Sequence, residues 1–424
     1  MKGDMLYMFS RFIPQPLKNL FYHFPLAVFA TVRFGFPARK LRVIGVTGTN
    51  GKTTTVQFIT RILRRAEKKT AMASTIGFAI GEREWTNASK FTTLSAWKLQ
   101  KFLREAADSG CEYAVVETSS HALDQYRVWG IDYDIAVMTN VTREHLDYHR
   151  TMKAYRQAKR RLFKQARRAV INLDMENPEE YFGFKRYAGV ISYGIEHPEA
   201  DIFAGGLALD ASGASFLVQG KEYRIHLPGR HNVENALAAI AVARILDIDS
   251  SVAIRALAEV SGVPGRMESV PNTRGLHIII DYAVTPDSLE KLYALIAGMR
   301  TGNSRIIAVL GACGERDRGK RPVMGSIVSS YADRLILTNE DPYHEDPERI
   351  LDEIECGVTG KEKGKDYWRI SDRREAIAQA LNLARSGDWV IVTGKGAEET
   401  MAVGDARLPW NERRVIEEEL GKLP

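Results

Sequence analysis

Cysteine is scarce in this sequence, and its spacing excludes two kinds of site. Only three cysteines occur among 424 residues, Cys111, Cys313 and Cys356. They form no C-x-x-C pair, so neither a disulfide framework nor a cysteine-based zinc site is indicated. This usage fits a protein of a reducing, cytosolic compartment.

A long apolar run is also lacking, although residues 1–38 are rich in aromatic side chains. Crossing a bilayer takes about 20 uninterrupted apolar residues, and prolines at positions 14, 16, 25 and 37 divide this stretch. No small-residue cleavage site follows an apolar core, so a signal peptide is not indicated. We interpret residues 1–38 as an aromatic and basic leader, which either packs on the protein surface or lies in a membrane interface.

Charge of one sign does not dominate the composition. The 59 basic residues against 53 acidic ones give a formal charge of +6, and the 45% hydrophobic and 26% charged fractions are ordinary for a globular protein. A mild positive charge suits a polyanionic small substrate as well as nucleic acid, and we expect small-molecule substrates and no nucleic-acid partner. The length predicts two or three domains.

One glycine-rich stretch is the clearest functional signal. Residues 43–55 read V-I-G-V-T-G-T-N-G-K-T-T-T, and apolar side chains recur at helical spacing over residues 57–65. Strand, glycine turn and helix make a phosphate-binding loop, because backbone N–H groups and the helix dipole meet an anion there. Lys52 adds a positive charge, and Thr53 or Thr54 offers a hydroxyl to Mg²⁺. The spacing is tighter than G-x-x-x-x-G-K-[ST], since Val46 stands at the first glycine position, and a chance glycine turn is the alternative.

From residue 41 onward, short apolar runs alternate with helical stretches. Runs at 113–117, 135–139 and 169–173 end in polar residues, which predicts an α/β fold with a parallel sheet and functional groups at its carboxyl edge. We assign a central P-loop-type ATPase domain to residues 39–262, with a more antiparallel section at 191–227. After the G-V-P-G linker at 262–265, the alternation begins afresh, and predicts a smaller Rossmann-like α/β domain over residues 263–424. The cleft between two domains is a natural site for joining two substrates.

Two polar clusters follow strands of the central domain. Glu117 opens the run E-T-S-S-H, where a carboxylate is placed to hold Mg²⁺ near a triphosphate; a helix-capping cluster is the alternative. Residues 140–149 read N-V-T-R-E-H-L-D-Y-H, a mixture that suits metal or phosphate contact, and zinc stays open by residue type. Lys159 lies beside Tyr155 on the next helical stretch, and a lysine so placed is usually solvated.

A series of motifs resembles those of the Mur ligases. They read T-G-T-N-G-K-T-T-T, E-T-S-S-H-A-L-D-Q-Y-R-V, T-N-V-T-R-E-H-L-D-Y-H with the later A-K-R-R-L-F, L-P-G-R-H-N-V-E-N-A-L-A-A-I, G-V-P-G-R-M-E, D-Y-A-V-T-P-D and G-A-C-G-E-R-D-R-G-K-R. The nearest type adds the third peptide residue to UDP-N-acetylmuramoyl-L-alanyl-D-glutamate. The resemblance implies an ATP-dependent amide-bond ligase of peptidoglycan precursor synthesis, in which a carboxylate is phosphorylated and an amine displaces the phosphate.

The resemblance also implies roles for individual residues. ATP would be bound by Gly48, Thr49, Asn50, Gly51, Lys52, Thr53, Thr54, Asn232, Asn235, Arg266 and Asp281. The substrates would be bound by Thr92, Thr93, Ser119, Gln125, Arg127, Asp341, Tyr343, Gly394 and Glu398. Catalysis would rest on Lys52, Glu117, His145 and Lys159. Two Mg²⁺ ions would be held by Thr53, Glu117, His145 and Lys159, the last as a carbamylated, anionic ligand.

The sequence departs from the family pattern in three places. The family has an N-terminal domain that holds the uridine diphosphate, whereas only the leader precedes the loop here. Either the remaining domains hold the nucleotide sugar, or a partner supplies that domain, or the acceptor is not a UDP sugar. The motif D-N-P-R ends in Tyr343 instead of arginine, which removes a bidentate partner for a distal carboxylate. We therefore expect lysine or another amine rather than diaminopimelate, with Asp341 and Glu398 attracting its cationic end. Val284 and Ala397 each replace a family histidine.

Two other functions stay open beside the peptidoglycan ligase. One is a related ligase that acts on another polyanionic peptide, such as polyglutamate or a pseudomurein-type precursor. The other is an inactive ATP-binding scaffold at the membrane surface. For the leading function we expect a monomeric cytoplasmic enzyme, with residues 1–38 as a peripheral contact to the inner face of the membrane.

Overall fold

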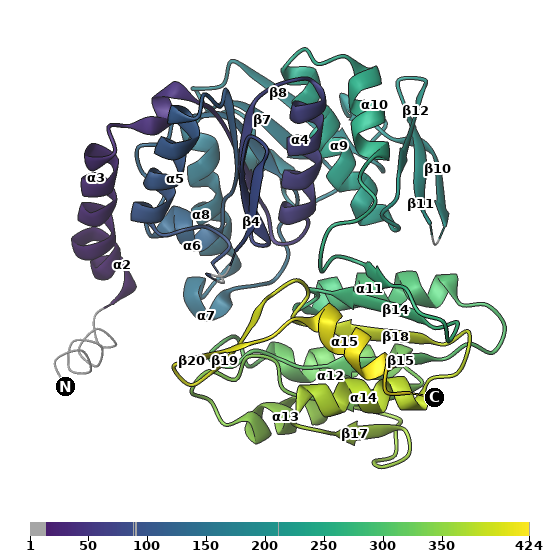
Figure 1. The fold of residues 1–424 in the computed structure, drawn as a ribbon. Helices are drawn as coiled ribbons and strands as arrows, with labels where there is room; N and C mark the ends of the chain where they lie inside the picture. Colours follow the sequence, from purple (N-terminus) through teal and green to yellow (C-terminus); the bar gives the residue numbers. More distant parts are fainter. Residues whose placement is uncertain (1–13, 88, 90, 211, 424) are drawn as a thin grey trace.

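A computed structural model describes residues 14–87, 89, 91–210 and 212–423 of the chain. An N-terminal helical segment precedes two α/β domains, which lie one above the other in Figure 1. Among the described residues, no helix is both long and apolar enough to cross a bilayer. The aromatic leader predicted at residues 1–38 lies partly outside the described part of the chain.

The N-terminal segment is helical from residue 15 to residue 33. It consists of α2 (Gln15–Lys18), the π-helical turn η1 (Asn19–His23) and α3 (Phe24–Arg33), followed by the 3-10 turn η2 (Pro37–Lys40). Pro16 and Pro25 stand in the first turns of α2 and α3, where a missing N–H breaks no helical hydrogen bond. These prolines therefore begin helices instead of interrupting the segment, which packs against α5 (Ala96–Asp108) on the outside of the first domain (Figure 1).

The first domain is built on a nine-stranded sheet in the order β4-β3-β2-β5-β1-β6-β7-β8-β9. The strands are β1 (Arg42–Thr47), β2 (Thr70–Ala73), β3 (Gly77–Ile80), β4 (Arg83–Thr86), β5 (Tyr113–Glu117), β6 (Tyr133–Met138), β7 (Ala166–Asn172), β8 (Gly189–Gly194) and β9 (Ile202–Phe203). In this order, every neighbouring pair from β2 through β5 and β1 to β9 is parallel, whereas β3 pairs antiparallel with both β2 and β4. β1, buried except for Arg42 and rich in β-branched residues, lies at the centre, which places its carboxyl end in the middle of the sheet edge.

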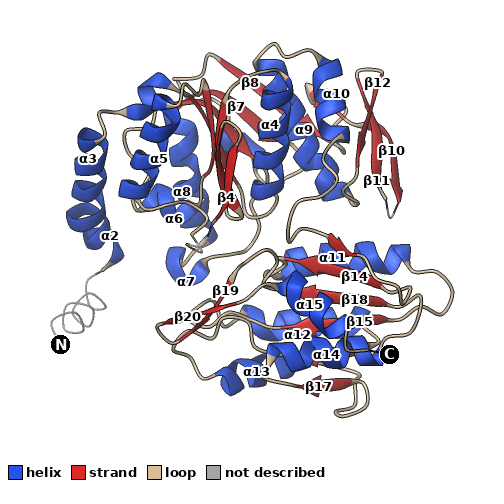
Figure 2. Ribbon diagram, in the orientation of Figure 1, coloured by secondary structure: helices blue, strands red, loops and turns tan. Residues whose placement is uncertain are grey.

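Helices cover both faces of this sheet (Figure 2). On one face, α4 (Lys52–Arg65), α9 (Arg230–Ile245) and α10 (Ser250–Ala258) share a core with Ile44, Val115 and Val137. On the other face lie α5, α6 (Ser120–Asp124) and α8 (Met152–Gln165), which pack on a second core. The short α7 (Leu146–His149) and the 3-10 turn η3 (Pro178–Tyr181) flank α8.

The section expected to be antiparallel from residue 191 is so only in its second half. β8 and β9 continue the parallel sheet. A separate three-stranded antiparallel sheet follows, formed by β10 (Gly205–Asp210), β11 (Gly213–Val218) and β12 (Lys221–Ile225). Its buried alternate residues, Phe216 and Tyr223 among them, join the core with α9 and α10, so this sheet extends the first domain.

The second domain is a six-stranded sheet in the order β13-β14-β18-β15-β16-β17. Its strands are β13 (Glu268–Val270), β14 (His277–Asp281), β15 (Ile306–Leu310), β16 (Arg334–Leu337), β17 (Tyr367–Arg369) and β18 (Trp389–Thr393). One face is covered by α11 (Pro286–Met299), α12 (Lys320–Tyr331) and α13 (Pro347–Glu355), and the other by α14 (Arg373–Leu383) and α15 (Glu412–Leu420). A hairpin of β19 (Thr400–Val403) and β20 (Ala406–Pro409) follows β18. The predicted fold class, two successive α/β domains with parallel-rich sheets, is confirmed.

Candidate functional site

The glycine-rich loop joins the carboxyl end of β1 to the first turn of α4. Its backbone is fixed by Asn140, whose carbonyl accepts from Thr49 N (2.9 Å) and whose side-chain oxygen accepts from Asn50 N (2.9 Å). Gly51 has a left-handed φ of 82°, and a Cβ atom there would lie 2.2 Å from Asn235 Oδ1. Only glycine fits this position, and the result is a loop that opens a 14-residue helix whose dipole favours an anion.

Lys52 is half-buried at the start of α4. Its Nζ donates to Thr49 O at 2.8 Å, across the loop. Burial lowers the pKa of Lys52, while the charge of Glu117 opposes that change. A lysine in this position offers a positive charge to a phosphate that enters the loop.

Glu117 ends the buried strand β5, and its side chain faces the loop. Thr53 Oγ1 donates to both of its carboxylate oxygens, at 3.1 and 3.2 Å. Thr75 adds its backbone N–H (2.8 Å) and hydroxyl (2.9 Å). The sequence singled out Glu117 and Thr53 but missed Thr75, because nothing in the segment after β2 marks that residue. The paired hydroxyl and carboxylate are oxygen donors of the kind that Mg²⁺ prefers.

Lys159 is fully buried, with 1% of its surface exposed. Its Nζ donates to Gly48 O at 2.7 Å and lies 4.4 Å from the centre of the Tyr155 ring. Burial holds the pKa of Lys159 well below its ordinary value, and the nearby Lys52 charge acts in the same direction. Lys159 is therefore not the solvated lysine that its surroundings in the sequence suggested. Burial favours the neutral amine, which is the form that reacts with electrophiles.

His145 stands before α7 with a left-handed φ of 58°. Its ring centre is 4.7 Å from that of His121 and 6.0 Å from that of Tyr155, the neighbour of Lys159. Burial first, and then the charges of His121 and Lys159, keep the pKa of His145 well below its ordinary value. Within the described residues, no three His, Cys, Asp or Glu side chains are grouped in a way that could hold a metal ion. A metal site here would therefore need the Thr53 hydroxyl, a modified lysine or substrate oxygens.

A connected set of polar side chains lies beside Glu117. Thr93 Oγ1 donates to Glu117 O at 2.9 Å and lies 3.2 Å from Ser119 Oγ. Arg127 donates to Thr93 O at 3.2 Å and to the Gln125 side chain. The structure thus brings together four of the five residues expected to hold the acceptor; Thr92, half-buried next to Thr93, completes the segment. A cationic Arg127 within reach of hydroxyl donors suits an anionic peptide.

The residues expected to bind the nucleotide lie on α9 and at the start of the second domain. Asn235 and Asn232 are buried on α9, where Asn235 Nδ2 donates to Asn232 Oδ1 at 3.2 Å and Asn235 Oδ1 accepts from Thr55 at 3.2 Å. Arg266, from the start of the second domain, donates to Thr53 Oγ1 at 3.3 Å. Asp281 accepts from Met267 N at 2.7 Å and has a pKa that burial raises. Its carboxylate therefore orders the backbone that carries Arg266.

Direct contacts join the two domains across this site. Asn50 Nδ2 in the loop donates to Asp287 Oδ2 of α11 at 2.8 Å. Lys320 of α12 forms an ion pair with Glu144 at 3.2 Å. A small pocket has walls from both domains, including Thr75, Arg266, Tyr282 and Glu398. The phosphate-binding loop therefore opens on the second domain, as an interdomain reaction site requires.

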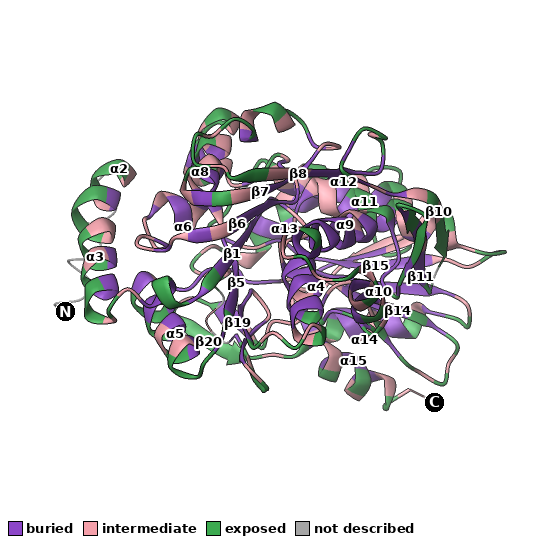
Figure 3. Cartoon of the chain, turned by 90° about the horizontal axis from the view of Figure 1, so that it is seen from above, coloured by how far each residue is buried: buried purple, intermediate pink, exposed green. Residues whose placement is uncertain are grey.

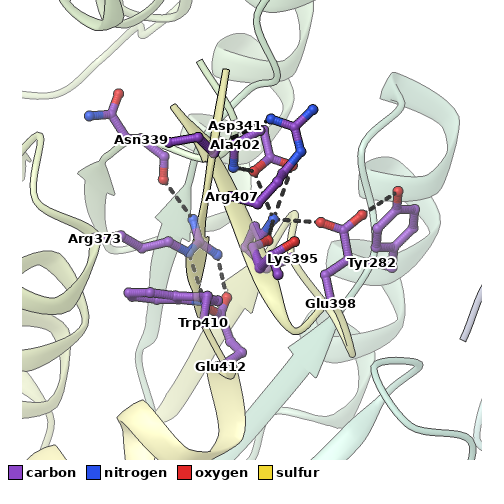
Figure 4. A network of polar contacts seen from close by, with 12 residues as sticks. Tyr282, Asn339, Asp341, Arg373, Lys395, Glu398, Ala402, Arg407, Trp410 and Glu412 are labelled. Atoms are coloured by element: carbon purple, nitrogen blue, oxygen red, sulfur yellow. Dashed lines mark hydrogen bonds and ion pairs between the residues drawn. The ribbon is translucent and has the colours of Figure 1, made fainter. Parts of the chain in front are cut away.

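A buried network occupies the second domain near β18 (Figure 4). Lys395 Nζ donates to both carboxylate oxygens of Asp341 (2.9 and 3.0 Å), to Thr400 O (2.8 Å) and to Glu398. Glu398 also accepts from Tyr282 at 3.2 Å. Asp341 and Glu398, both expected at the amino-acid substrate, thus share one buried lysine that sequence reasoning overlooked, because the two residues are separated by more than fifty positions in the chain.

Gly394 and Tyr343, the other two residues expected there, border the same network. Gly394 has a left-handed φ of 109°, and a Cβ atom would lie 2.7 Å from Glu340 Oε2. Tyr343 is half-buried with a φ of 52°. Nearby, Arg373 and Glu412 form a fully buried ion pair that ties α14 to α15.

Comparison with known proteins gives the same domain order. Residues 46–243 match the Mur ligase middle domain, and residues 265–396 match the Mur ligase, glutamate ligase domain. A UDP-N-acetylmuramoyl-L-alanyl-D-glutamate--2,6-diaminopimelate ligase of Syntrophomonas wolfei is 41% identical over 411 residues, which cover 94% of this chain and 82% of that protein. A solved structure of a ligase with that name is 33% identical, with a TM-score of 0.61, over 90% of this chain and 78% of that one. The Mycobacterium tuberculosis folylpolyglutamate synthase complexed with ADP shares the fold at 18% identity and a TM-score of 0.72, over 92% and 95% of the two chains.

Proposed function

The chain belongs to the Mur ligase family, and we propose that it is an ATP-dependent ligase that adds an amino acid to UDP-N-acetylmuramoyl-L-alanyl-D-glutamate. One observation carries the proposal: Lys52, Glu117 and Lys159 come from three elements and converge on a single phosphate-binding loop. That convergence supports an intact phosphoryl-transfer site. The acceptor is taken from the names of the relatives, whose middle and C-terminal domains this chain shares.

The proposed reaction has two chemical steps. The γ-phosphoryl group of ATP is transferred to an acceptor carboxylate oxygen, which leaves ADP and an acyl phosphate. The amine of the incoming amino acid then attacks the acyl carbon, and inorganic phosphate departs from the tetrahedral intermediate with the C–O bond electrons. A free carboxylate is inert towards amines, so the first step supplies the leaving group that the second needs.

The residues of this chain have distinct tasks in that scheme. The N–H groups of the loop and Lys52 hold the triphosphate. Thr93, Ser119 and Arg127 orient the acceptor so that its carboxylate meets the γ-phosphate. The second domain, held by the Asn50–Asp287 and Lys320–Glu144 contacts, brings the amino acid to the acyl phosphate and excludes water.

We propose two Mg²⁺ ions at this site, held by Thr53, Glu117, His145 and Lys159. The Thr53 hydroxyl and Glu117 carboxylate, 3.1 Å apart, are hard oxygen donors beside the loop and fit one ion. Magnesium would offset the negative charge that gathers on the phosphates. The fold relative crystallised with ADP supports the choice of nucleotide.

We further propose that Lys159 carries a carbamate. The neutral amine attacks CO₂, forms an N–C bond and releases one proton, which turns a buried cation into an anion. The burial that disfavours the ammonium form supports this reaction, as does the position of Nζ at 2.7 Å from a loop carbonyl. The carbamate oxygens would give magnesium further oxygen ligands besides Thr53 and Glu117. Among the described residues, His, Cys, Asp and Glu side chains alone do not form a metal site.

Release of phosphate from ATP tests the proposed function. We expect release only when UDP-muramoyl dipeptide and an amino acid are both present, together with a product whose mass equals acceptor plus amino acid minus water. Ligation of a polyglutamate or pseudomurein-type acceptor instead would favour a related ligase, although the relatives favour peptidoglycan. Phosphate release that ignores both substrates, or none at all, would contradict a ligase.

We propose that the enzyme acts as a monomer in the cytoplasm. Both sides of the interdomain site come from one chain, through contacts such as Arg266 with Thr53, so a second copy is not needed to complete it. ATP and nucleotide-linked sugars are cytoplasmic metabolites, and the cysteines, Cys111, Cys313 and Cys356, are all free.

We propose that the segment α2–α3 touches the inner face of the membrane. Figure 3 shows that α3 carries both buried and exposed residues. The fully buried residues of the segment are small or polar, whereas most of its exposed residues are apolar. The buried side includes Asn19, which donates to Asp124 at 2.7 Å, and Thr31, which donates to Trp129 O at 3.1 Å. The exposed apolar side chains are Leu17 (45%), Leu20 (50%), Phe21 (74%), Tyr22 (64%), Leu26 (36%), Phe29 (60%) and Val32 (58%).

The charge of this segment favours an anionic lipid surface as the partner. No aspartate or glutamate occurs between Asp4 and Glu67. Lys18, Arg33, Arg39 and Lys40 lie in or beside the helices. Aromatic residues on one face together with basic residues and no acids are the features of helices that lie in a membrane interface.

A further inference from the structure

The segment α2–α3 holds one turn of the first domain, residues 124–130, at both of its ends. Asn19 Nδ2, in the buried first position of the π-helical turn η1, donates to Asp124 Oδ2 at 2.7 Å. At the other end, Thr31 Oγ1 donates to Trp129 O at 3.1 Å. A π-helical turn is rare in proteins and occurs frequently at functional sites. The segment therefore fixes both ends of the 124–130 turn.

The middle of the 124–130 turn is supported by the same segment. Tyr126 has a left-handed φ of 53°, a conformation that residues with a side chain seldom adopt. The Phe24 ring of α3 packs edge-on against the Tyr126 ring, with 5.2 Å between the centres. Gly130 has a φ of 78° and lies so close to the segment that a Cβ atom there would be 2.5 Å from the methyl carbon of Thr31. An unfavourable backbone is thus held from outside by α2–α3.

Two residues expected to bind the acceptor lie inside this turn. Gln125 and Arg127 stand on either side of Tyr126 in the chain. Arg127 donates to Thr93 O at 3.2 Å and to the Gln125 side chain. A change of the backbone at Tyr126 would move both residues. The direction of the Arg127 guanidinium, and with it the fit to an anionic peptide, therefore depends on the turn that the segment holds.

Asp124 joins the segment to two further helices beside the site. Its Oδ2 accepts from Asn19 and also from Tyr148 OH of α7, at 2.9 Å. Its Oδ1 pairs with Arg161 of α8 at 3.0 Å. The carboxylate is therefore held on three sides, and it cannot rotate away from position 19 without losing its partners on α7 and α8.

We propose that the segment α2–α3 is a positioning element of the acceptor site, in which Asn19 and Phe24 fix the 124–130 turn and thereby set the affinity for the acceptor peptide. The inference rests on the proposed ligase function. Both residues act through Gln125 and Arg127. The segment then has two tasks on two sides, because its exposed apolar residues face the membrane while its buried residues order the acceptor site.

A like charge tests the contact between Asn19 and Asp124. In Asn19→Asp, the new carboxylate faces that of Asp124 and should push the segment away from the turn. We expect the KM for the acceptor to rise about fivefold or more, whereas the KM for ATP stays within about twofold of wild type. The control Asn303→Asp makes the same substitution at an exposed position of the second domain, and should leave both constants as in wild type.

A second variant removes the aromatic contact without adding charge. Phe24→Ala should raise the KM for the acceptor in the same selective way, and it gives the same test should Asn19→Asp fail to fold. If both KM values rise together in a folded variant, the segment serves overall stability only and the inference is overturned. A KM for the acceptor that neither variant changes by about twofold would overturn it as well.

An exchanged pair separates positioning from general damage. In Asn19→Asp with Asp124→Asn, the amide at position 124 can donate to the carboxylate at position 19, so the KM for the acceptor should return toward the wild-type value. An exchanged pair no better than Asn19→Asp would contradict the inference and leave the ligase function standing. Failure of the wild type to ligate any amino acid would overturn both.

Discussion

Lys159 on α8 donates a 2.7 Å hydrogen bond to the carbonyl of Gly48, the first glycine of the phosphate-binding loop. The two residues are 111 positions apart, and their contact places a buried amine against the phosphate-binding loop. A buried lysine without an acidic partner of its own is costly. We infer that the protein keeps this destabilising buried lysine because its amine takes part in catalysis.

Substitution of Lys159 tests the carbamate. We expect Lys159→Ala to lower kcat by about a hundredfold or more, because the proposed carbamate ligand for magnesium is lost with the side chain. Acetate or formate should restore part of the activity by filling the space with a carboxylate. The control is Lys153→Ala, an exposed lysine on the same helix. Full activity of Lys159→Ala, measured as phosphate release, would refute the carbamate role.

Gly51→Ala should damage the loop for two reasons. The left-handed φ of 82° costs about 1–2 kcal/mol for a residue with a side chain, and the new methyl group collides with Asn235 Oδ1. We expect lower thermal stability and loss of ATP binding by calorimetry. Gly183→Ala has a similar φ of 74° but open space around it, so it should lose stability only and keep ATP affinity. Equal ATP affinity in both variants would argue against a phosphate site at Gly51.

Through Glu340 and Glu345, the stability of the folded protein should depend on pH in opposite ways. Burial, with the charge of Asp341, raises the pKa of Glu340 to about 7, and its Oε2 is among the buried atoms of the described residues that have no hydrogen-bond partner. The folded protein then holds a proton that the unfolded chain releases near pH 4.5, so this residue costs stability increasingly as pH rises from about 4.5 to 7. Glu340→Gln should therefore stabilise the protein by roughly 1–3 kcal/mol at pH 8 and have little effect at pH 4.

Glu345 provides the comparison of opposite sign. Hydrogen bonds from Arg321 lower the pKa of Glu345 to about 2. Its stabilising contribution is complete above about pH 4.5 and is lost as the pH falls toward 2. Glu345→Gln should therefore destabilise the protein at pH 8, in contrast to Glu340→Gln, as measured by urea unfolding. A loss of stability in both variants at pH 8 would contradict the assignment for Glu340.

Membrane contact should depend on the exposed side of α2–α3. The double variant Phe21→Ser, Phe29→Ser should bind anionic vesicles at least about tenfold more weakly, since each phenylalanine contributes about 1.5–3 kcal/mol when buried in lipid. Its ligase activity without vesicles should stay unchanged. Phe91→Ser, which removes another exposed phenylalanine outside this segment, is the control. Failure of the wild type to sediment with phosphatidylglycerol vesicles at low salt would exclude the contact.

Local patterns in the sequence were enough to predict the fold class and the phosphate-binding loop. The apolar run at 113–117 appears as β5, because a fully buried parallel strand needs such residues whatever surrounds it. Gly51 and Lys52 can be assigned to a phosphate-binding loop because the strand and helix patterns that define it lie within a few residues of them. The leader at 1–38 was harder to interpret, since its composition identified aromatic and basic character but not the side of the helix that faces solvent.

The sequence by itself determined that this chain is a two-domain α/β protein with a nucleotide loop and the ordered motifs of one family. Only the tertiary structure decided that Lys159 is buried, that Lys395 already binds Asp341 and Glu398, and that Asn19 contacts Asp124. The physical reason is the distance along the chain between the residues that determine each property. Strand and helix patterns arise from neighbours within a few residues, whereas burial and charge pairing depend on side chains that the fold brings together from 50 or more positions away.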